Sequence, residues 1–174
     1  MIRWGANIAP LTLTGEPLRL LTSVFLHAGL LHLALNMYLL LAVGGIVEKA
    51  FGAICFTIIY LVAGLSGSLL SALWYAHRTL SHVLIVNGDV IRKEQLDLVV
   101  SVGASGALMG IASASVTHWL VVKRDNALPA AQRMRNALLQ TIGLTLLMGF
   151  LLPGVDNAAH CGSLRLTAAG CWAG

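Results

Sequence analysis

The chain has 174 residues, of which 57% are hydrophobic and only 10% are charged, and its mean hydropathy is +0.83. Soluble domains carry about 25% charged residues, so this composition excludes an ordinary soluble protein and indicates one integral membrane domain over residues 1–174. The net charge of +4 is dispersed along the chain, which excludes a nucleic-acid-binding surface. The sequence contains no CxxC or HExxH spacing, so we expect no metal site.

Five apolar segments predict membrane-spanning helices. Residues 1–19 come before them and lack the continuous apolar core of a signal peptide, so they predict an outer loop. A helical span needs about 20 apolar residues, which predicts spans at about 20–47, 50–76, 98–122, 137–153 and 157–174. Their residues do not alternate between polar and apolar as barrel strands do. The predicted fold is therefore an all-α polytopic membrane bundle.

The connecting segments indicate how the helices are oriented. The short loop after the third span contains four basic residues, which favour the cytoplasmic side: Lys123, Arg124, Arg133 and Arg135. Alternation then places residues 1–19 and the 77–97 loop on the outer side. The 77–97 segment is an outer-loop insertion in which Asn87-Gly88 predicts the turn of a short hairpin.

Two residues of catalytic type are predicted at the same depth in the membrane. Ser105 lies about seven residues into the third span, within "VGASGALMG", and His160 lies a few residues into the last segment. At about 1.5 Å per residue, both fall within roughly 10 Å of the outer face. Ionisable residues in spans are functional candidates, and a histidine that accepts the Ser105 proton would form a dyad for nucleophilic catalysis.

A second polar pair lies in the first span. His32 and Asn36 are four residues apart and therefore share one helix face. Together with the backbone N–H of Ser105, these side chains could stabilise the oxyanion of a tetrahedral intermediate. Gly103 and Gly106, on either side of the serine, would allow backbone to approach closely.

Each of these residues also has a purely structural interpretation. Ser105 could belong to a small-residue helix interface with Gly106, Gly110 and Ala114, and His32 with Asn36 could be an interhelical hydrogen-bonded pair. His160 could simply begin a helix, and Asp156 is interpreted as the N-cap of that helix rather than a third catalytic member. A second GxSG pattern, around Ser66 in "GLSGSLL", is interpreted as a packing face.

Three motifs, taken in order, resemble the signatures of the rhomboid intramembrane serine proteases. They are "HLALNM", "GASGALMG" and "DNAAHCG". The segment "LTGEPLRLLTSVFLHAG", with Arg19, is similar to the outer first loop of that family, and "GGIVEKAFG", with Glu48, is similar to the inner end of its second helix.

The resemblance implies a rhomboid-like bundle with about five of the usual six transmembrane helices. It implies that Ser105 is the nucleophile, that His160 is the general base and acid, and that His32 and Asn36 serve the oxyanion. Supporting positions carried over from the motifs are Gly103, Gly106, Ala159 and Gly162. It implies no cofactor, substrates that are single-span membrane proteins in the lipid bilayer, and a multi-pass location, expected to be a bacterial inner or plasma membrane.

The chain departs from the family pattern in three places. The opening helix of the family is missing, which predicts a fragment or a misplaced start. The last segment has Ser163 and Thr167 in place of glycines, adds Arg165 and ends early. A mid-bilayer arginine costs about 2.5–3.5 kcal/mol on insertion scales. Met109 occupies a position that is often aromatic, and methionine can fill that space.

Two alternative functions predict different sequence features from those of an active protease. A catalytically impaired relative that binds transmembrane helices without cleaving them would tolerate loss of the dyad, whereas Ser105, His160, His32 and Asn36 are all present. A transporter or channel would predict inverted repeats or paired broken helices, which the sequence does not contain. The sequence therefore favours an intramembrane serine endopeptidase.

Overall fold

A computed structural model of the chain describes residues 1–174 apart from 82, 87–88, 93–98, 123–128, 152–154 and 171–174. Most of the described residues are helical, which confirms the predicted all-α class. In chain order the elements are η1 (Ile2–Trp4), α1 (Ala9–Thr14), α2 (Arg19–Phe25), α3 (Leu30–Leu39), η2 (Leu40–Gly44), α4 (Gly45–Phe51), α5 (Ala53–Ser81), β1 (Val83–Val86), β2 (Asp89–Arg92), α6 (Ser105–Val122), α7 (Pro129–Leu151) and α8 (Asn157–Gly170).

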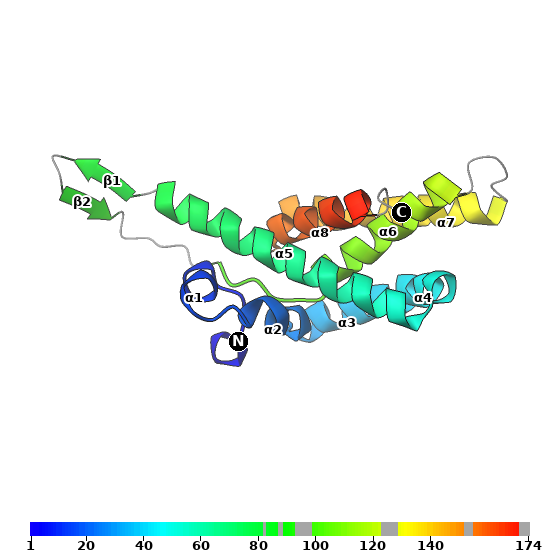
Figure 1. The fold of residues 1–174 in the computed structure, drawn as a ribbon, viewed down its shortest axis with the longest axis horizontal. Coiled ribbons are helices and arrows are strands. Elements are labelled where there is room, and N and C mark those ends of the chain that lie inside the picture. Colours follow the sequence, from blue (N-terminus) through cyan, green and yellow to red (C-terminus); the bar gives the residue numbers. More distant parts are fainter. Residues whose placement is uncertain (82, 87–88, 93–98, 123–128, 152–154, 171–174) are drawn as a thin grey trace.

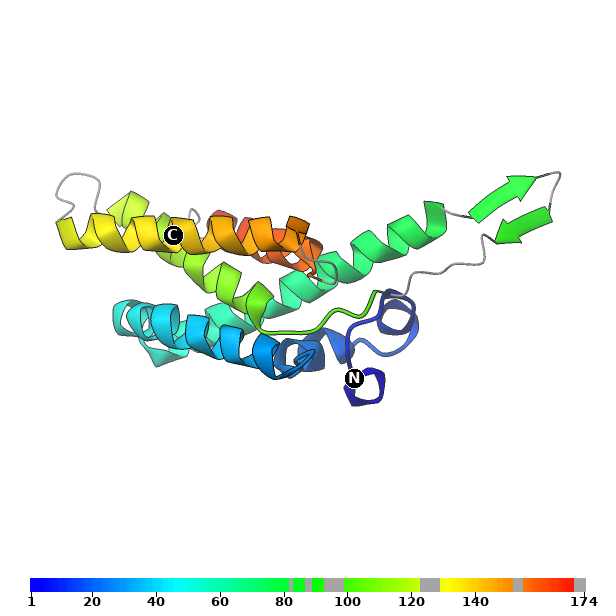
Figure 2. The ribbon, with the colours of Figure 1, turned by 180° about the vertical axis from the view of Figure 1, so that it is seen from behind.

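Helix α5 is the centre of the molecule. It runs diagonally between the N-terminal elements α1–α4 on one side and α6–α8 on the other (Figures 1 and 2). Helices α5, α6 and α8 pack against one another in all three pairs. Small residues at these contacts, including Ala63 and Ala107, are fully buried and allow the helices to approach closely. The two helices that carry Ser105 and His160 therefore share α5 as a common support.

The predicted span at 20–47 is wrong as a single helix. The chain leaves the helical conformation at Leu26, which is extended, and helix α3 starts only after Gly29. The span itself consists of α3, the π-helical turn η2 and α4, and it ends at Phe51, where Gly52 adopts a φ of +80°. Apolar composition alone did not reveal this break, since "FLHAGLLH" is nearly as apolar as the helix that follows.

The predicted span at 98–122 begins too early. Residues 99–104 are not helical, and α6 starts at Ser105 itself. The segment is held extended by a backbone bridge with two hydrogen bonds between Asn7 and Ser101, and the Gly103 N–H donates to the Ser23 carbonyl at 2.9 Å. Partners from the N-terminal segment therefore satisfy this backbone in place of helical hydrogen bonds.

Of the last two helices, α7 differs from prediction at its start and α8 does not. Helix α7 begins at Pro129, before the predicted 137, because proline fits the first turn of a helix. Helix α8 begins at the predicted Asn157 and is described to Gly170. The basic loop residues Lys123 and Arg124 and the Thr167 side chain lie outside the described residues.

The predicted hairpin in the 77–97 loop is confirmed. Helix α5 continues into this loop as far as Ser81, after which β1 and β2 pair antiparallel with Val83 opposite Arg92 and Val86 opposite Asp89. The predicted turn residues, Asn87 and Gly88, lie outside the described residues.

The exterior of the helices is apolar. Large side chains such as Leu30, Leu41, Ile54 and Phe150 are exposed, while a core of small and aliphatic residues lies inside. Among the described residues, Leu30–Phe51 and Ala53–Arg78 are long and apolar enough to cross a membrane, and Ser105–Thr117 and Leu138–Leu151 are shorter apolar helical stretches. Exposed leucine and phenylalanine suit helices whose outer faces contact lipid.

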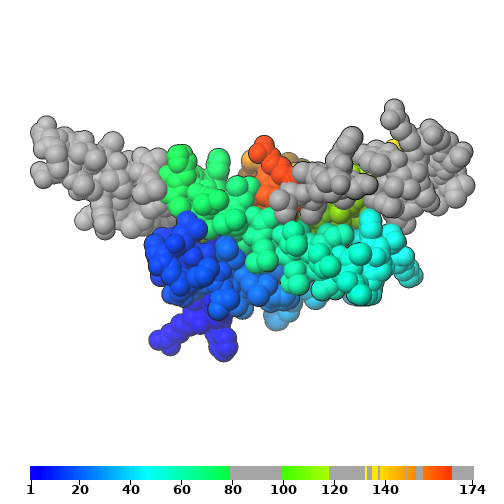
Figure 3. All heavy atoms as spheres, viewed as in Figure 1, coloured from blue at the N-terminus to red at the C-terminus, as the bar shows by residue number. Residues whose placement is uncertain are grey.

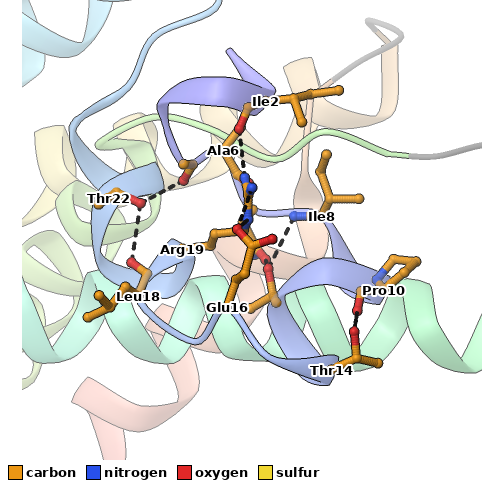
Figure 4. A network of polar contacts seen from close by, with 12 residues as sticks. Ile2, Ala6, Ile8, Pro10, Thr14, Glu16, Leu18, Arg19 and Thr22 are labelled. Carbon is orange, nitrogen blue, oxygen red and sulfur yellow. Dashed lines mark hydrogen bonds and ion pairs between the residues drawn. The ribbon is translucent and has the colours of Figure 1, made fainter.

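The N-terminal segment packs against α5 rather than lying free. Figure 3 shows residues 1–25, α5 and α3–α4 as one continuous face. Arg19 organises this segment: its Nη1 donates to the carbonyls of Ile2, at 2.8 Å, and Ala6, at 3.0 Å, and its Nε donates to Glu16 (Figure 4). One guanidinium thereby links two backbone carbonyls of the N-terminal segment to a carboxylate.

Candidate active site

Ser105 and His160 meet where α6 and α8 begin. Nε2 of His160 lies 2.9 Å from Oγ of Ser105, although the residues are 55 positions apart. His160 is buried, with 2% of its surface exposed, and Ser105 is half-buried. A serine hydroxyl at hydrogen-bond distance from an imidazole nitrogen is the arrangement in which the imidazole can take the hydroxyl proton during attack.

Ser105 is the first residue of α6, not a residue seven positions inside it. The first N–H groups of a helix have no partner within the helix and carry its positive dipole end. Ser105 and Gly106 both line a cavity. The serine Oγ and the N-terminal end of α6 are therefore presented to the same space, where negative charge on an oxygen would be stabilised.

His32 contributes a donor to this region. The backbone N–H of Ala28 donates to Nδ1 of His32 at 3.2 Å, so a neutral His32 carries its proton on Nε2. That nitrogen lies close to Gly103: a Cβ built on Gly103 would be 2.9 Å from Nε2. Since Gly103 also has a φ of +123°, any side chain there would be strained and would collide with His32.

Asn36 lies one helical turn behind His32. It is 2% exposed, and its Nδ2 donates to the His32 carbonyl at 2.9 Å. Unlike His32, Asn36 is absent from the described residues that line the cavity. The structure brings Asn36 to the Gly103 side of the site, with Nδ2 3.8 Å from a Cβ built on Gly103.

The supporting positions divide between two interfaces. A Cβ on Gly106 would contact Ser163 and Ala159, so Gly106 and Ala159 lie at the contact between α6 and α8. A Cβ on Gly162 would instead collide with Leu70 and the Ser66 carbonyl of α5. The Ser66 hydroxyl donates to the Ala63 carbonyl within α5, in agreement with a packing role.

Ser163, one of the departures from the family pattern, is completely buried. Its hydroxyl donates to the Ala63 carbonyl of α5 at 2.8 Å and also lies 3.1 Å from the Ala159 carbonyl. Arg165, two residues later, is exposed on α8. The serine is therefore accommodated by hydrogen bonding to backbone, while the arginine points away from the helix contacts.

Asp156 caps α8, as the sequence predicted. Its Oδ1 accepts the Ala159 N–H at 3.0 Å, and its Oδ2 accepts the Ser71 hydroxyl of α5. Both carboxylate oxygens are thus engaged away from the imidazole. The residue that faces the second ring nitrogen of His160 is Asn157, whose Oδ1 lies 3.3 Å from Nδ1.

Sequence reasoning did not single out Asn157. The signal that could have found it is its spacing, because residues three apart lie on one face of a helix. The neighbouring Asp156 was the more obvious candidate, because an aspartate is the usual third member of a serine–histidine catalytic triad.

The cavity of about 540 Å³ joins these groups into one site. Its lining includes His32, Gly103, Ser105, Gly106, Ala159 and His160, and Met1 also borders it. Groups from α3, α6 and α8 therefore face a space large enough for a short stretch of peptide.

A protein-family model matches most of the chain. Residues 14–173 match the model of the Rhomboid domain. The chain belongs to the rhomboid family.

Three curated relatives illustrate the similarity. Rhomboid protease AarA of Providencia stuartii is 39% identical over 174 residues, which cover 97% of this chain and 59% of the relative. RHOMBOID-like protein 6, mitochondrial, of Arabidopsis thaliana is 37% identical over 86% of this chain and 41% of the relative. Rhomboid protease GluP of Bacillus subtilis is 31% identical over 94% of this chain and 27% of the relative.

This chain thus spans less than two thirds of the length of these relatives. Rhomboid-family proteins are integral membrane proteins, in keeping with the apolar helices described above.

Proposed function

We propose that this rhomboid-family chain is an intramembrane serine endopeptidase that hydrolyses peptide bonds through a Ser105–His160 dyad. The observation that carries the proposal is the 2.9 Å distance between His160 Nε2 and Ser105 Oγ at the edge of a cavity. A serine that merely packed helices together would need neither a buried imidazole as its partner nor an adjoining cavity.

The proposed reaction uses only groups of the chain and water. His160 Nε2 takes the Ser105 proton while Oγ attacks the substrate carbonyl, and the resulting oxyanion is stabilised by the Ser105 N–H, His32 and Asn36. The imidazolium then returns the proton to the leaving amine, which gives an acyl-enzyme. Water, deprotonated by His160, hydrolyses that ester and restores the Ser105 hydroxyl. We therefore expect no requirement for a metal or cofactor.

The substrates we propose are single-span transmembrane proteins, presented within the lipid bilayer. A helical peptide bond is shielded by its own hydrogen bonds, so cleavage favours segments that unwind easily near small residues. The proposed setting is a multi-pass protein of a bacterial inner or plasma membrane, with the cavity on the outer side.

Fluorophosphonate labelling in detergent tests the proposal. Such probes react only with an activated serine, so we expect labelling of the unaltered chain and its loss in Ser105→Ala. Ser66→Ala is the matched control, because Ser66 has the same GxSG surroundings but donates to its own helix backbone. Labelling that persists in Ser105→Ala, or is absent from the unaltered chain, would overturn the proposal and favour a relative that binds transmembrane helices without cleaving them.

A further inference from the structure

The second nitrogen of the His160 ring has a partner that defines how the imidazole is protonated. Nδ1 lies 3.3 Å from Oδ1 of Asn157. An amide oxygen can only accept a hydrogen bond, so this contact requires the proton to be on Nδ1. In a neutral ring, Nε2 then carries the lone pair and faces Ser105 Oγ. This is the tautomer that a general base at Nε2 needs.

The orientation of the Asn157 amide is in turn fixed by α7. Its Nδ2 donates to the Leu146 carbonyl at 3.3 Å. The reverse orientation would place the amide oxygen against that carbonyl oxygen and the NH₂ group against Nδ1. Two acceptors would then face each other, which is unfavourable in a partly buried place. The Leu146 carbonyl therefore selects the orientation in which Oδ1 meets the imidazole.

Gly149 provides the space for this side chain. A Cβ on Gly149 would lie 2.5 Å from Asn157 Cγ and 2.7 Å from Nδ2. Gly149 and Leu146 are three residues apart and so lie on the same face of α7. The amide of Asn157 therefore packs against the Cα of Gly149 and donates to the Leu146 carbonyl on the same face of α7.

We propose that Asn157 is a positioning residue for the peptide-bond hydrolysis proposed above, holding the His160 imidazole in the tautomer and orientation that accept the Ser105 proton. The inference rests on that proposed function. Asp156 cannot take this part in the observed arrangement, because its two oxygens are engaged by Ala159 and Ser71. Among the described residues that line the cavity, the other titratable side chains are those of Asp156 and His32, and the hydrogen bond described for Nδ1 is the one to Asn157.

Substitutions of Asn157 distinguish a role in positioning the His160 imidazole from a role in protein stability alone. In Asn157→Ala we expect kcat for a fluorogenic transmembrane peptide to fall about tenfold or more, with KM changed less than about twofold. Asn157→Asp keeps an acceptor for Nδ1–H, so most of the rate returns at alkaline pH. The added carboxylate also stabilises the imidazolium, so the acidic limb of the pH–rate profile moves to higher pH. A merely structural part would depend on the hydrogen bond to the Leu146 carbonyl, which an aspartate cannot donate, so Asn157→Asp would then fail to restore the rate.

Two glycines of α7 form a matched pair that leaves Asn157 itself unaltered. Gly149→Ala should displace the amide and lower kcat as Asn157→Ala does. Gly143→Ala should retain the original rate, because no atom lies within 4 Å of a Cβ at Gly143.

The outcomes separate the two proposals. An unchanged kcat and pH profile in Asn157→Ala and Asn157→Asp, with labelling still lost in Ser105→Ala, would overturn the positioning part and leave the protease proposal standing. Equal effects of Gly149→Ala and Gly143→Ala would also count against it. Absence of labelling in the unaltered chain would overturn both.

Discussion

At the scale of single residues, the site depends on hydrogen bonds that fix where protons reside. Nδ1 of His32 accepts the Ala28 N–H, so the proton of the neutral ring is on Nε2, which is a donor. Nδ1 of His160 donates to Oδ1 of Asn157, so Nε2 of that ring is an acceptor. The two histidines therefore present opposite hydrogen-bonding characters to one cavity. In the proposed reaction, the donor on His32 would stabilise the oxyanion and the acceptor on His160 would take the Ser105 proton.

The first prediction concerns pH. Only the neutral imidazole of His160 can accept the Ser105 proton, so protonation at acid pH removes the base. We expect the rate of fluorophosphonate labelling to fall about tenfold for each pH unit once His160 is mostly protonated. The measurement is the initial labelling rate between pH 5 and 8, with hydrolysis of the probe alone as the control. A flat profile over this range would contradict the assignment of His160.

The second prediction concerns the oxyanion donor. His32→Ala should lower kcat by about 10²–10³, equivalent to roughly 2.7–4 kcal/mol, because the donor acts mainly on the transition state. His77→Ala is the matched control, since His77 is exposed at the far end of α5. The measurement is cleavage of a transmembrane peptide at saturating concentration. If both variants cleave at equal rates, His32 is not the donor.

At the scale of elements, two helix starts and one extended segment build the site. Helix α6 begins at its serine because residues 99–104 are held by Asn7 and Ser23, and both of these contact Ser68 of α5. Helix α8 begins at Asn157 because Asp156 caps it and reaches Ser71, one turn along α5 from Ser68. The face of α5 that carries these two serines therefore sets the position of Ser105 relative to His160.

The third prediction concerns this cap. Asp156→Ala removes both the α8 cap and the contact with Ser71, and we expect a loss of about 0.5–2 kcal/mol of stability together with slower labelling. Asp156→Asn keeps an oxygen for the Ala159 N–H and should recover much of the stability. Ser71→Ala removes the interhelical contact alone. Thermal unfolding in detergent measures the effect, and equal melting temperatures for Asp156→Ala and the unaltered chain would refute it.

At the scale of the whole molecule, the N-terminal segment is part of the site although it carries no reacting group. Arg19 holds that segment together through its contacts with Ile2, Ala6 and Glu16. Asn7 of the same segment pairs with Ser101, four residues before Ser105. The outer segment, α5 and the start of α6 therefore form one connected support.

The fourth prediction tests this connection. Arg19→Met should loosen residues 1–18, increase their cleavage by an added soluble protease and slow labelling of Ser105. Arg3→Met is the matched control, because Arg3 is exposed on η1. Limited proteolysis combined with labelling measures both effects. Faster proteolysis with an unchanged labelling rate would show that the segment and the nucleophile are independent.

Much of this architecture was accessible from sequence because hydropathy and motif order depend on local composition. The five helical regions, the hairpin and the Asp156 cap were predicted from runs, turn residues and spacing. The break at Leu26 and the late start of α6 were not, because both depend on partners distant in sequence, such as Asn7 and Ser23. The spacing of Asn157 to His160 was readable from the sequence, but the orientation of its amide was not, because a carbonyl of α7 determines it.

Met1 borders the cavity that contains the serine hydroxyl. A polypeptide joined ahead of Met1 would therefore lie beside this cavity. We expect an affinity tag fused there to compete with the substrates proposed above and to lower the apparent turnover.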